Sequence, residues 1–245
     1  MRLSVVLALV LLVACSDASA PAQLPATPTP LVFTPIGDAL VQGMPPSGAD
    51  TTTVGYIFVD GAGARLLDGL SFSAGPEPQP LSDATTQIWL DTSVADTLGN
   101  VLRTAGAVRY AAVVARGRLE GPGAYGPEGS YRYHMRDAHV EPLAPQETTI
   151  GGLLDNSAAY NGRFVRIIGA LLARADSALL VDRLGSGGLP APETRQIKLR
   201  GPLRDTALLS RLQGASGGTI HFGQVQVEGV WHGGALTPLS VSPIL

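Results

Sequence analysis

The chain has few cysteines, few aromatic side chains and almost no lysine. Cys15 is the only cysteine among 245 residues, which excludes an intramolecular disulfide and leaves no thiolate for metal binding or nucleophilic chemistry in the part that follows. Hydrophobic residues still make up 45% of the chain, enough to form cores without covalent cross-links. The 30 glycines and 19 prolines are typical of many short strands joined by turns.

Basic residues do not outnumber acidic residues in the chain. Lys198 is the only lysine, and the formal net charge is −3. Proteins that depend on phosphate contacts usually carry a basic face or a basic net charge. The composition therefore argues mildly against a nucleic-acid ligand, although a local basic patch stays possible.

The amino terminus combines a positive charge with a short apolar run. Arg2 precedes the nearly continuous apolar residues 5–13, which match the hydrophobic region of a signal peptide and are too short to span a bilayer. The run ends in Leu12-Val13-Ala14-Cys15. This segment resembles the bacterial lipobox, an aliphatic residue and two small or β-branched residues before a cysteine.

The lipobox resemblance implies a lipoprotein signal peptide at residues 1–14 and fatty acylation of Cys15, palmitate included. Several acyl chains anchor stably where one is marginal. The alternative is an ordinary secretory signal cleaved later, for example after Ala20. Ser16 follows the cysteine and favours the outer membrane in organisms that sort lipoproteins by this position. We expect a lipid-anchored, extracytoplasmic protein of the cell envelope.

Residues 15–34 are rich in proline, alanine and threonine. Such a composition favours an extended, solvated chain and cannot form a core. We interpret this segment as a tether between the lipid anchor and the folded part.

The remaining sequence contains an internal repeat. Short segments of residues 35–145 recur in the same order in residues 146–245, and we interpret the two ranges as related domains. The clearest matches pair Ile36-Gly37-Asp38-Ala39-Leu40 with Ile150-Gly151-Gly152-Leu153-Leu154, Gln87-Ile88-Trp89-Leu90 with Gln196-Ile197-Lys198-Leu199, and Gly117-Arg118-Leu119-Glu120-Gly121 with Gly229-Val230-Trp231-His232-Gly233.

The second copy shows its element order most clearly. A helix should begin near Thr149, which can cap it, and end at Tyr160-Asn161-Gly162. The expected elements that follow are strands 163–174, 177–183 and 195–199, helix 203–213, and strands 219–231 and 236–242. Three strands, a helix and two strands are the order of the OB-fold, a small Greek-key barrel. Residues 154–165 and 223–229 also resemble the opening and the fourth strand of bacterial OB-fold domains. The predicted fold class is therefore mainly β, with two OB-fold-like barrels, each carrying a short helix.

No motif in the sequence indicates catalysis or a cofactor. His134 and His139 are five residues apart and His221 and His232 eleven, which places each pair on opposite faces of a regular strand. Neither pair has an obvious carboxylate partner in sequence, so no metal site is predicted. A Gly-x-Ser-x-Gly nucleophile motif is absent, and Asp60-Gly61 is interpreted as a hairpin turn. Paired carboxylates stay open because two acids can meet from anywhere in the sequence; the candidates are Asp60, Asp68, Asp91 and Asp182.

The richest aromatic segment precedes the last strand of the first copy. It contains Tyr125, Tyr131, Arg132 and Tyr133, which we predict as ligand-binding residues. OB-folds commonly bind through this loop and through the face of strands two and three. Tyrosine and arginine there can stack on bases or sugars, or contact a protein. The alternative is a glycine-rich hairpin with alternating exposed tyrosines.

Three functional hypotheses remain. The first is a membrane-anchored, non-enzymatic binding or scaffolding lipoprotein whose partner is an envelope protein, a glycan or a small molecule. The second is an OB-fold nucleic-acid-binding protein of the envelope. The third is an envelope hydrolase with an unrecognised site. A contiguous basic groove would favour the second, and a deep pocket with paired acids or a Ser-His pair would favour the third.

Overall fold

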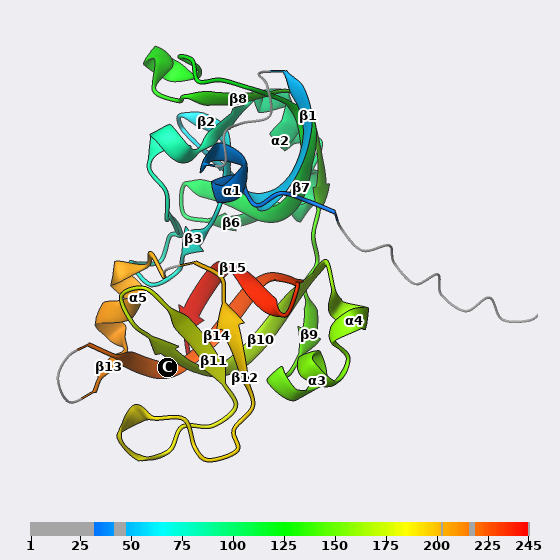
Figure 1. The fold of residues 1–245 in the computed structure, drawn as a ribbon. Helices are drawn as coiled ribbons and strands as arrows, with labels where there is room; N and C mark the ends of the chain where they lie inside the picture. The colour runs from blue at the N-terminus through cyan, green and yellow to red at the C-terminus, as the bar shows by residue number, and fades with distance from the viewer. Residues whose placement is uncertain (1–31, 42–47, 202, 216–218, 245) are drawn as a thin grey trace, which may run out of the picture.

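A computed structural model describes residues 32–41, 48–201, 203–215 and 219–244. In this part of the chain the fold is mainly β and contains two closed five-stranded barrels, one above the other in Figure 1. We call them barrel 1 and barrel 2 in chain order. The predicted signal peptide, Cys15 and most of the tether lie outside the described residues.

Barrel 1 has the strand order of an OB-fold. Its strands are β1 (Ala49–Asp60), β2 (Gly63–Leu67), β5 (Ile88–Leu90), β7 (Val108–Glu120) and β8 (Tyr133–Pro142). They pair in the order β1-β2-β5-β8-β7, and pairing of β1 with β7 closes the barrel. The β5–β8 pair is parallel and the other pairs are antiparallel, as the Greek-key connection requires.

Barrel 2 repeats this topology. Its strands are β10 (Arg163–Ala173), β11 (Ala178–Val181), β12 (Gln196–Leu199), β14 (His221–His232) and β15 (Ala235–Pro243). The β12–β15 pair is parallel, and β14 closes the barrel by pairing with both β10 and β15. The predicted fold class, two OB-fold-like barrels with short helices, is therefore confirmed.

Short helices and small strands connect the barrel strands. The helices are α1 (Ile36–Val41), α2 (Thr92–Asp96), α3 (Ile150–Asp155), α4 (Ser157–Tyr160) and α5 (Thr206–Arg211), with 3-10 turns at Ala84–Thr86, Gly99–Val101, Pro127–Gly129 and Ser186–Gly188. The additional strands are β3 (Leu70–Ser71), β4 (Gln79–Pro80), β6 (Arg103–Ala105), β9 (Gln146–Thr148) and β13 (Gln213–Gly214).

Several local predictions for barrel 2 are confirmed. Thr149 caps α3, and its Oγ1 accepts a hydrogen bond from the Gly152 N–H at 3.0 Å. The helical segment stops at Tyr160, and Gly162 has a φ of +73°, which glycine adopts without steric cost. The expected helix 203–213 is shorter, because α5 begins only after Asp205, which caps it.

A glycine in the first strand of each barrel makes room for the helix before it. A Cβ on Gly55 would lie 2.8 Å from Cδ1 of Ile36, and a Cβ on Gly169 would lie 2.9 Å from Cδ1 of Ile150. The strand registers place Gly55 and Gly169 at equivalent positions, opposite Val113 and Val225. The segments that begin at Ile36 and Ile150, matched in the sequence, therefore perform the same packing in both barrels.

The long fourth strand of each barrel bends at a glycine. The register shifts near Gly117 in β7 and at Gly229 in β14. A Cβ would lie 2.7 Å from the Arg136 carbonyl oxygen at Gly117 and 2.4 Å from the Thr237 carbonyl oxygen at Gly229. The absence of a side chain thus lets the last two strands approach closely while the barrel curves.

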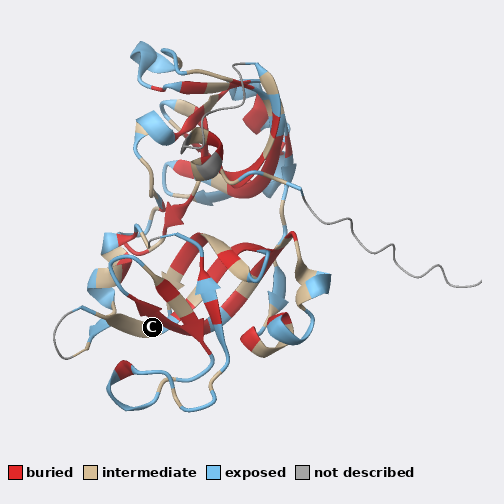
Figure 2. Ribbon diagram, in the orientation of Figure 1, coloured by how far each residue is buried: buried red, intermediate tan, exposed pale blue. Residues whose placement is uncertain are grey.

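Buried apolar residues form one core inside each barrel and a third cluster between the barrels, as the red segments of Figure 2 indicate. The third cluster joins Val54 and Tyr56 of barrel 1 to Val230 and Leu239 of barrel 2. The β3–β4 hairpin, which belongs to the loop between β2 and β5, pairs in parallel with β15 of barrel 2. The barrels are therefore joined by packing and by backbone hydrogen bonds.

Candidate functional site

The loop between β7 and β8 and the adjacent strands form a distinct surface at the end of barrel 1 farthest from barrel 2 (Figure 1). We define this loop face by Arg65 of β2, Trp89 of β5, and Tyr125, Tyr131 and Arg132 of the loop. Cross-strand pairing places Arg65 directly opposite Trp89, on the face of strands two and three of the OB-fold. The sequence thus predicted the correct region of the fold for this aromatic loop.

The aromatic side chains of the loop face support one another. The rings of Trp89 and Tyr131 lie 5.0 Å apart, and Arg65 Nη1 donates a 2.7 Å hydrogen bond to the Tyr131 hydroxyl. The backbones of Tyr125 and Tyr131 exchange two hydrogen bonds, and the Tyr125 ring stacks on His134 at 5.4 Å. These contacts hold the loop in one conformation in the free protein. The loop therefore loses less conformational entropy when a partner binds.

The four residues predicted to bind ligand are placed very differently. Arg132 is exposed and Tyr125 half-buried, whereas Tyr131 and Tyr133 are only 5% and 8% exposed. Tyr133 belongs to the core of barrel 1. The alternative of alternating exposed tyrosines is therefore wrong: two of the three fill space beneath the loop. Arg132 and Tyr125, with the half-buried Trp89, remain accessible.

The electrostatics of the loop face are mixed. Arg65 is buried and forms an ion pair with Asp60, so its charge is neutralised where an OB-fold ligand would lie. His134 lies 3.5 Å from carboxylate oxygens of both Asp91 and Glu120. The expectation that His134 lacks a carboxylate partner is wrong, because strand pairing and the α2 connection bring these acids together from distant parts of the sequence.

The other acids named from the sequence are dispersed. Asp68 pairs with Arg204 of barrel 2, and Asp182 is exposed at the end of β11. Among the residues that the structure describes, no three histidine, cysteine or acidic side chains are grouped closely enough to hold a metal ion. His139 pairs with Glu141 on the surface.

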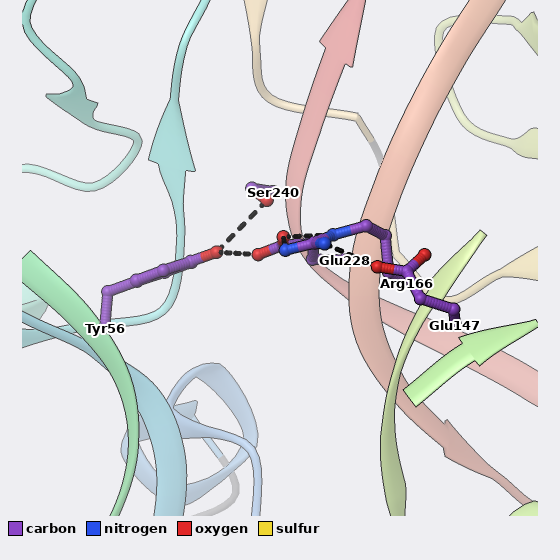
Figure 3. Close-up of polar contacts among 5 residues, drawn as sticks. All are labelled: Tyr56, Glu147, Arg166, Glu228 and Ser240. Atoms are coloured by element: carbon purple, nitrogen blue, oxygen red, sulfur yellow. Dashed lines mark hydrogen bonds and ion pairs between the residues drawn. The ribbon is translucent and has the colours of Figure 1, made fainter. Parts of the chain in front are cut away.

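A chain of polar side chains crosses from one barrel to the other (Figure 3). The Tyr56 hydroxyl of barrel 1 donates to Glu228 Oε2 at 2.8 Å and lies 3.2 Å from Ser240 Oγ. Arg166 donates to Glu228 Oε1 from Nε at 2.7 Å, and its Nη1 lies 2.5 Å from Glu147 Oε1. Glu228 is 6% exposed, and both of its carboxylate oxygens accept a hydrogen bond.

Burial affects the pKa values of Tyr56 and Arg166 in this row of polar side chains. Burial, followed by the negative charge of Glu228, raises the pKa of the Tyr56 phenol far above its ordinary value. Burial lowers the pKa of Arg166, but its hydrogen bonds and attraction to Glu228 and Glu147 outweigh this effect and raise the pKa overall. The stable form is a neutral phenol donating to a carboxylate that is paired with an arginine.

The sequence did not predict these polar contacts between the barrels. Glu228 alternates with Val227 and Gly229, which correctly places it on the outer face of its strand, where solvent is the ordinary neighbour. Barrel 1 covers that face instead. Gln224 and Gln226 precede Glu228 on the same side of the strand, so the sequence gives no signal that another barrel covers this face, and the partners of Glu228 lie far away in the sequence.

No protein-family model matches the chain, and neither a curated protein nor a solved structure shows significant similarity to it. Within the described ranges, no helix is long and apolar enough to cross a membrane. Function is therefore argued from the surfaces themselves.

Proposed function

We propose that this chain is a membrane-anchored lipoprotein of the cell envelope that acts as a non-enzymatic binding or scaffolding module. Cys15 would carry the lipid, and residues 15–34 would form the tether. The loop face of barrel 1 would contact the partner, an envelope protein or a glycan.

The observation that carries the proposal is the preformed loop face. Its shape is fixed by the Trp89–Tyr131 packing and the Arg65–Tyr131 hydrogen bond, while Tyr125 and Arg132 stay accessible at its edge. Accessible tyrosine and arginine on a rigid base are typical of the residues that contribute most to binding. The loop also lies at the far end of the molecule from barrel 2, so a partner can reach it unhindered (Figure 1).

The charge at this face favours a binding module over a nucleic-acid protein. The arginine on strand two is neutralised by Asp60, and Asp91, Glu120 and Glu128 lie on or beside the loop. Backbone binding of DNA or RNA needs accessible positive charge along a groove. We expect no salt-dependent binding of single-stranded DNA at micromolar protein; clear binding that weakens with added salt would favour the nucleic-acid alternative.

Cell fractionation tests the anchor. The Cys15→Ser variant should leave the membrane fraction, because the tether has no other lipid attachment site in sequence. Retention of this variant in membranes would contradict lipidation at Cys15 as the anchor.

Site-specific photo-crosslinking in cells tests the binding face. A crosslinker replacing Arg132 should give discrete adducts, and one replacing the exposed Arg174 of barrel 2 should not. Adding Trp89→Ala, which removes the support of the loop, should weaken the adducts at position 132 while the protein remains folded. Equal adducts at both positions would contradict a specific loop-face interaction.

A further inference from the structure

A cavity of about 170 Å³, partly open to solvent, lies between the two barrels on the side where the chain enters barrel 1. A single water needs only about 10–15 Å³, so the cavity has room for a small organic molecule. Its wall is mainly apolar and comes from both barrels, with Phe33, Val54 and Leu81 facing Val230 and Leu239. These walls extend the apolar cluster between the barrels.

Two aspartates line the same cavity, and each has an unused acceptor. Asp205 is 3% exposed; its Oδ1 accepts from the Leu208 N–H at 2.8 Å, but its Oδ2 has no hydrogen-bond partner among the described residues. Asp68 uses Oδ2 to pair with Arg204 at 2.7 Å, and its buried Oδ1 is likewise unpartnered among these residues. Buried carboxylate oxygens without donors are rare in folded proteins.

Two arginines also line the cavity, and both are exposed to solvent. Arg204 pairs with Asp68, and Arg200 Nη2 donates to the His232 carbonyl oxygen at 3.3 Å. Asp205, by contrast, is buried and forms no ion pair within the described part of the chain. An ionised carboxylate only accepts hydrogen bonds, and the strongest complement is a charged donor.

We propose that this cavity is a binding site for a small molecule that joins a protonated primary amine to a short apolar body. The ammonium group pairs with the Asp205 carboxylate, with Asp68 as a second acceptor, and the apolar body packs against Val54 and Leu239. The site is separate from the loop face and does not depend on the function proposed for it.

Ligand-observed NMR on the detergent-solubilised full chain tests this site with n-butylamine, n-butanol and butyrate, which share one body length. Butylamine should bind most tightly and butanol at least about tenfold more weakly. Butyrate should also bind more weakly than butylamine, because the buried charge at the cavity is Asp205, whereas Arg200 and Arg204 are exposed to solvent. Butyrate binding as tightly as butylamine, or no binding of butylamine, would overturn the proposal.

A matched pair of variants identifies the residue. Asp205→Asn keeps a side-chain oxygen for the Leu208 N–H and so preserves the helix cap, but it removes the charge. It should weaken butylamine binding at least about tenfold. Asp83→Asn makes the same change at Asp83, an exposed residue that caps a 3-10 turn, and should leave binding unchanged.

A third variant separates the cavity from a surface effect. Leu81→Phe adds volume to the cavity wall and should weaken butylamine and butanol together, with the loop-face crosslinks unaffected. Circular dichroism confirms that each variant is folded. A butylamine affinity within twofold of the parent in both Asp205→Asn and Leu81→Phe would overturn the assignment.

Discussion

The two barrels share their topology but differ in what surrounds it. Barrel 1 connects its last two strands by the long loop of residues 121–132, whereas barrel 2 uses the tight turn Gly233-Gly234. On the face of strands two and three, Arg65 and Trp89 of barrel 1 correspond by register to Leu179 and Lys198 of barrel 2. The connection between the last two strands is therefore elaborated in barrel 1 and minimal in barrel 2.

The outer face of the fourth strand also differs between the barrels, and here barrel 2 carries the buried contact. Arg116 of barrel 1 and Glu228 of barrel 2 occupy equivalent positions, paired with Thr52 and Arg166 respectively. Arg116 is exposed, whereas Glu228 is buried against barrel 1. The outer face of the fourth strand therefore packs against the other barrel in barrel 2, whereas the equivalent face of barrel 1 is exposed to solvent at Arg116. Shared topology fixes the positions of residues but not their environments.

The largest effect is expected at Glu228. Glu228→Ala removes the acceptor of both Tyr56 and Arg166 and should lower the free energy of unfolding by about 3–4 kcal/mol, because the buried Tyr56 hydroxyl loses its charged acceptor and Arg166 loses its buried partner. Arg116→Ala at the equivalent exposed position should cost at most about 0.5 kcal/mol. Urea denaturation measures both; similar costs would mean that the difference between the two faces is energetically unimportant.

Glu147→Ala serves as a second control. It removes only the exposed partner of Arg166, so the loss should stay within about 1 kcal/mol. A cost for Glu147→Ala that equals the cost for Glu228→Ala would assign the stability to Arg166 itself and not to its burial with Glu228.

A smaller contrast is expected at the paired glycines of the first strands. A Cβ at Gly55 would meet the Leu67 carbonyl oxygen at 2.2 Å, whereas a Cβ at Gly169 meets only side-chain carbons at 2.9 Å. Backbone cannot yield as side chains can, so Gly55→Ala should cost about 3 kcal/mol and Gly169→Ala about 1 kcal/mol. Thermal unfolding of both variants measures the difference; the reverse order would contradict the idea that backbone contact decides the cost.

Tyr56→Phe should have a smaller effect at neutral pH than Glu228→Ala or Gly55→Ala. Tyr56→Phe loses the hydrogen bonds to Glu228 and Ser240 and should cost about 1 kcal/mol at pH 7. The raised pKa of Tyr56 means that its stabilising contribution is complete below pH about 10 and is lost above it, where the unfolded chain releases the phenol proton and the folded chain retains it.

Denaturation at alkaline pH measures this contribution. The parent should lose up to about 1.4 kcal/mol of stability per pH unit more than Tyr56→Phe above pH about 10. Identical slopes for the parent and Tyr56→Phe would show that Tyr56 ionises alike in both states.

The sequence was sufficient for the parts of the fold that depend on local signals. The Thr149 cap, the Gly162 stop and the Asp60-Gly61 hairpin all depend on a few neighbouring residues, and each is where the sequence predicted it. The repeat supplied the rest of the topology, because an OB-fold order legible in the second copy could be transferred to the first.

The candidate site was predictable only in its location. The loop with Tyr125 and Arg132 was found from its composition, but the burial of Tyr131 depends on Trp89 and Arg65, which lie far away along the chain. Tyr133 is buried in the core of barrel 1. The Tyr56–Glu228 contact and the aspartates of the cavity depend on how one barrel sits on the other. Periodicity describes one strand and one face, so it carries no information about a second domain that covers that face.

The β3–β4 hairpin connects the two barrels by strand pairing that is independent of the covalent link between them. Leu70 and Ser71 extend the sheet of barrel 2 from within a loop of barrel 1, while the covalent connection between the barrels is only the short segment 143–145. A cut in that segment would leave the hairpin, the apolar cluster and the Tyr56–Glu228 hydrogen bond in place. Because these contacts do not depend on the covalent link, we expect the two halves to remain associated after such a cut.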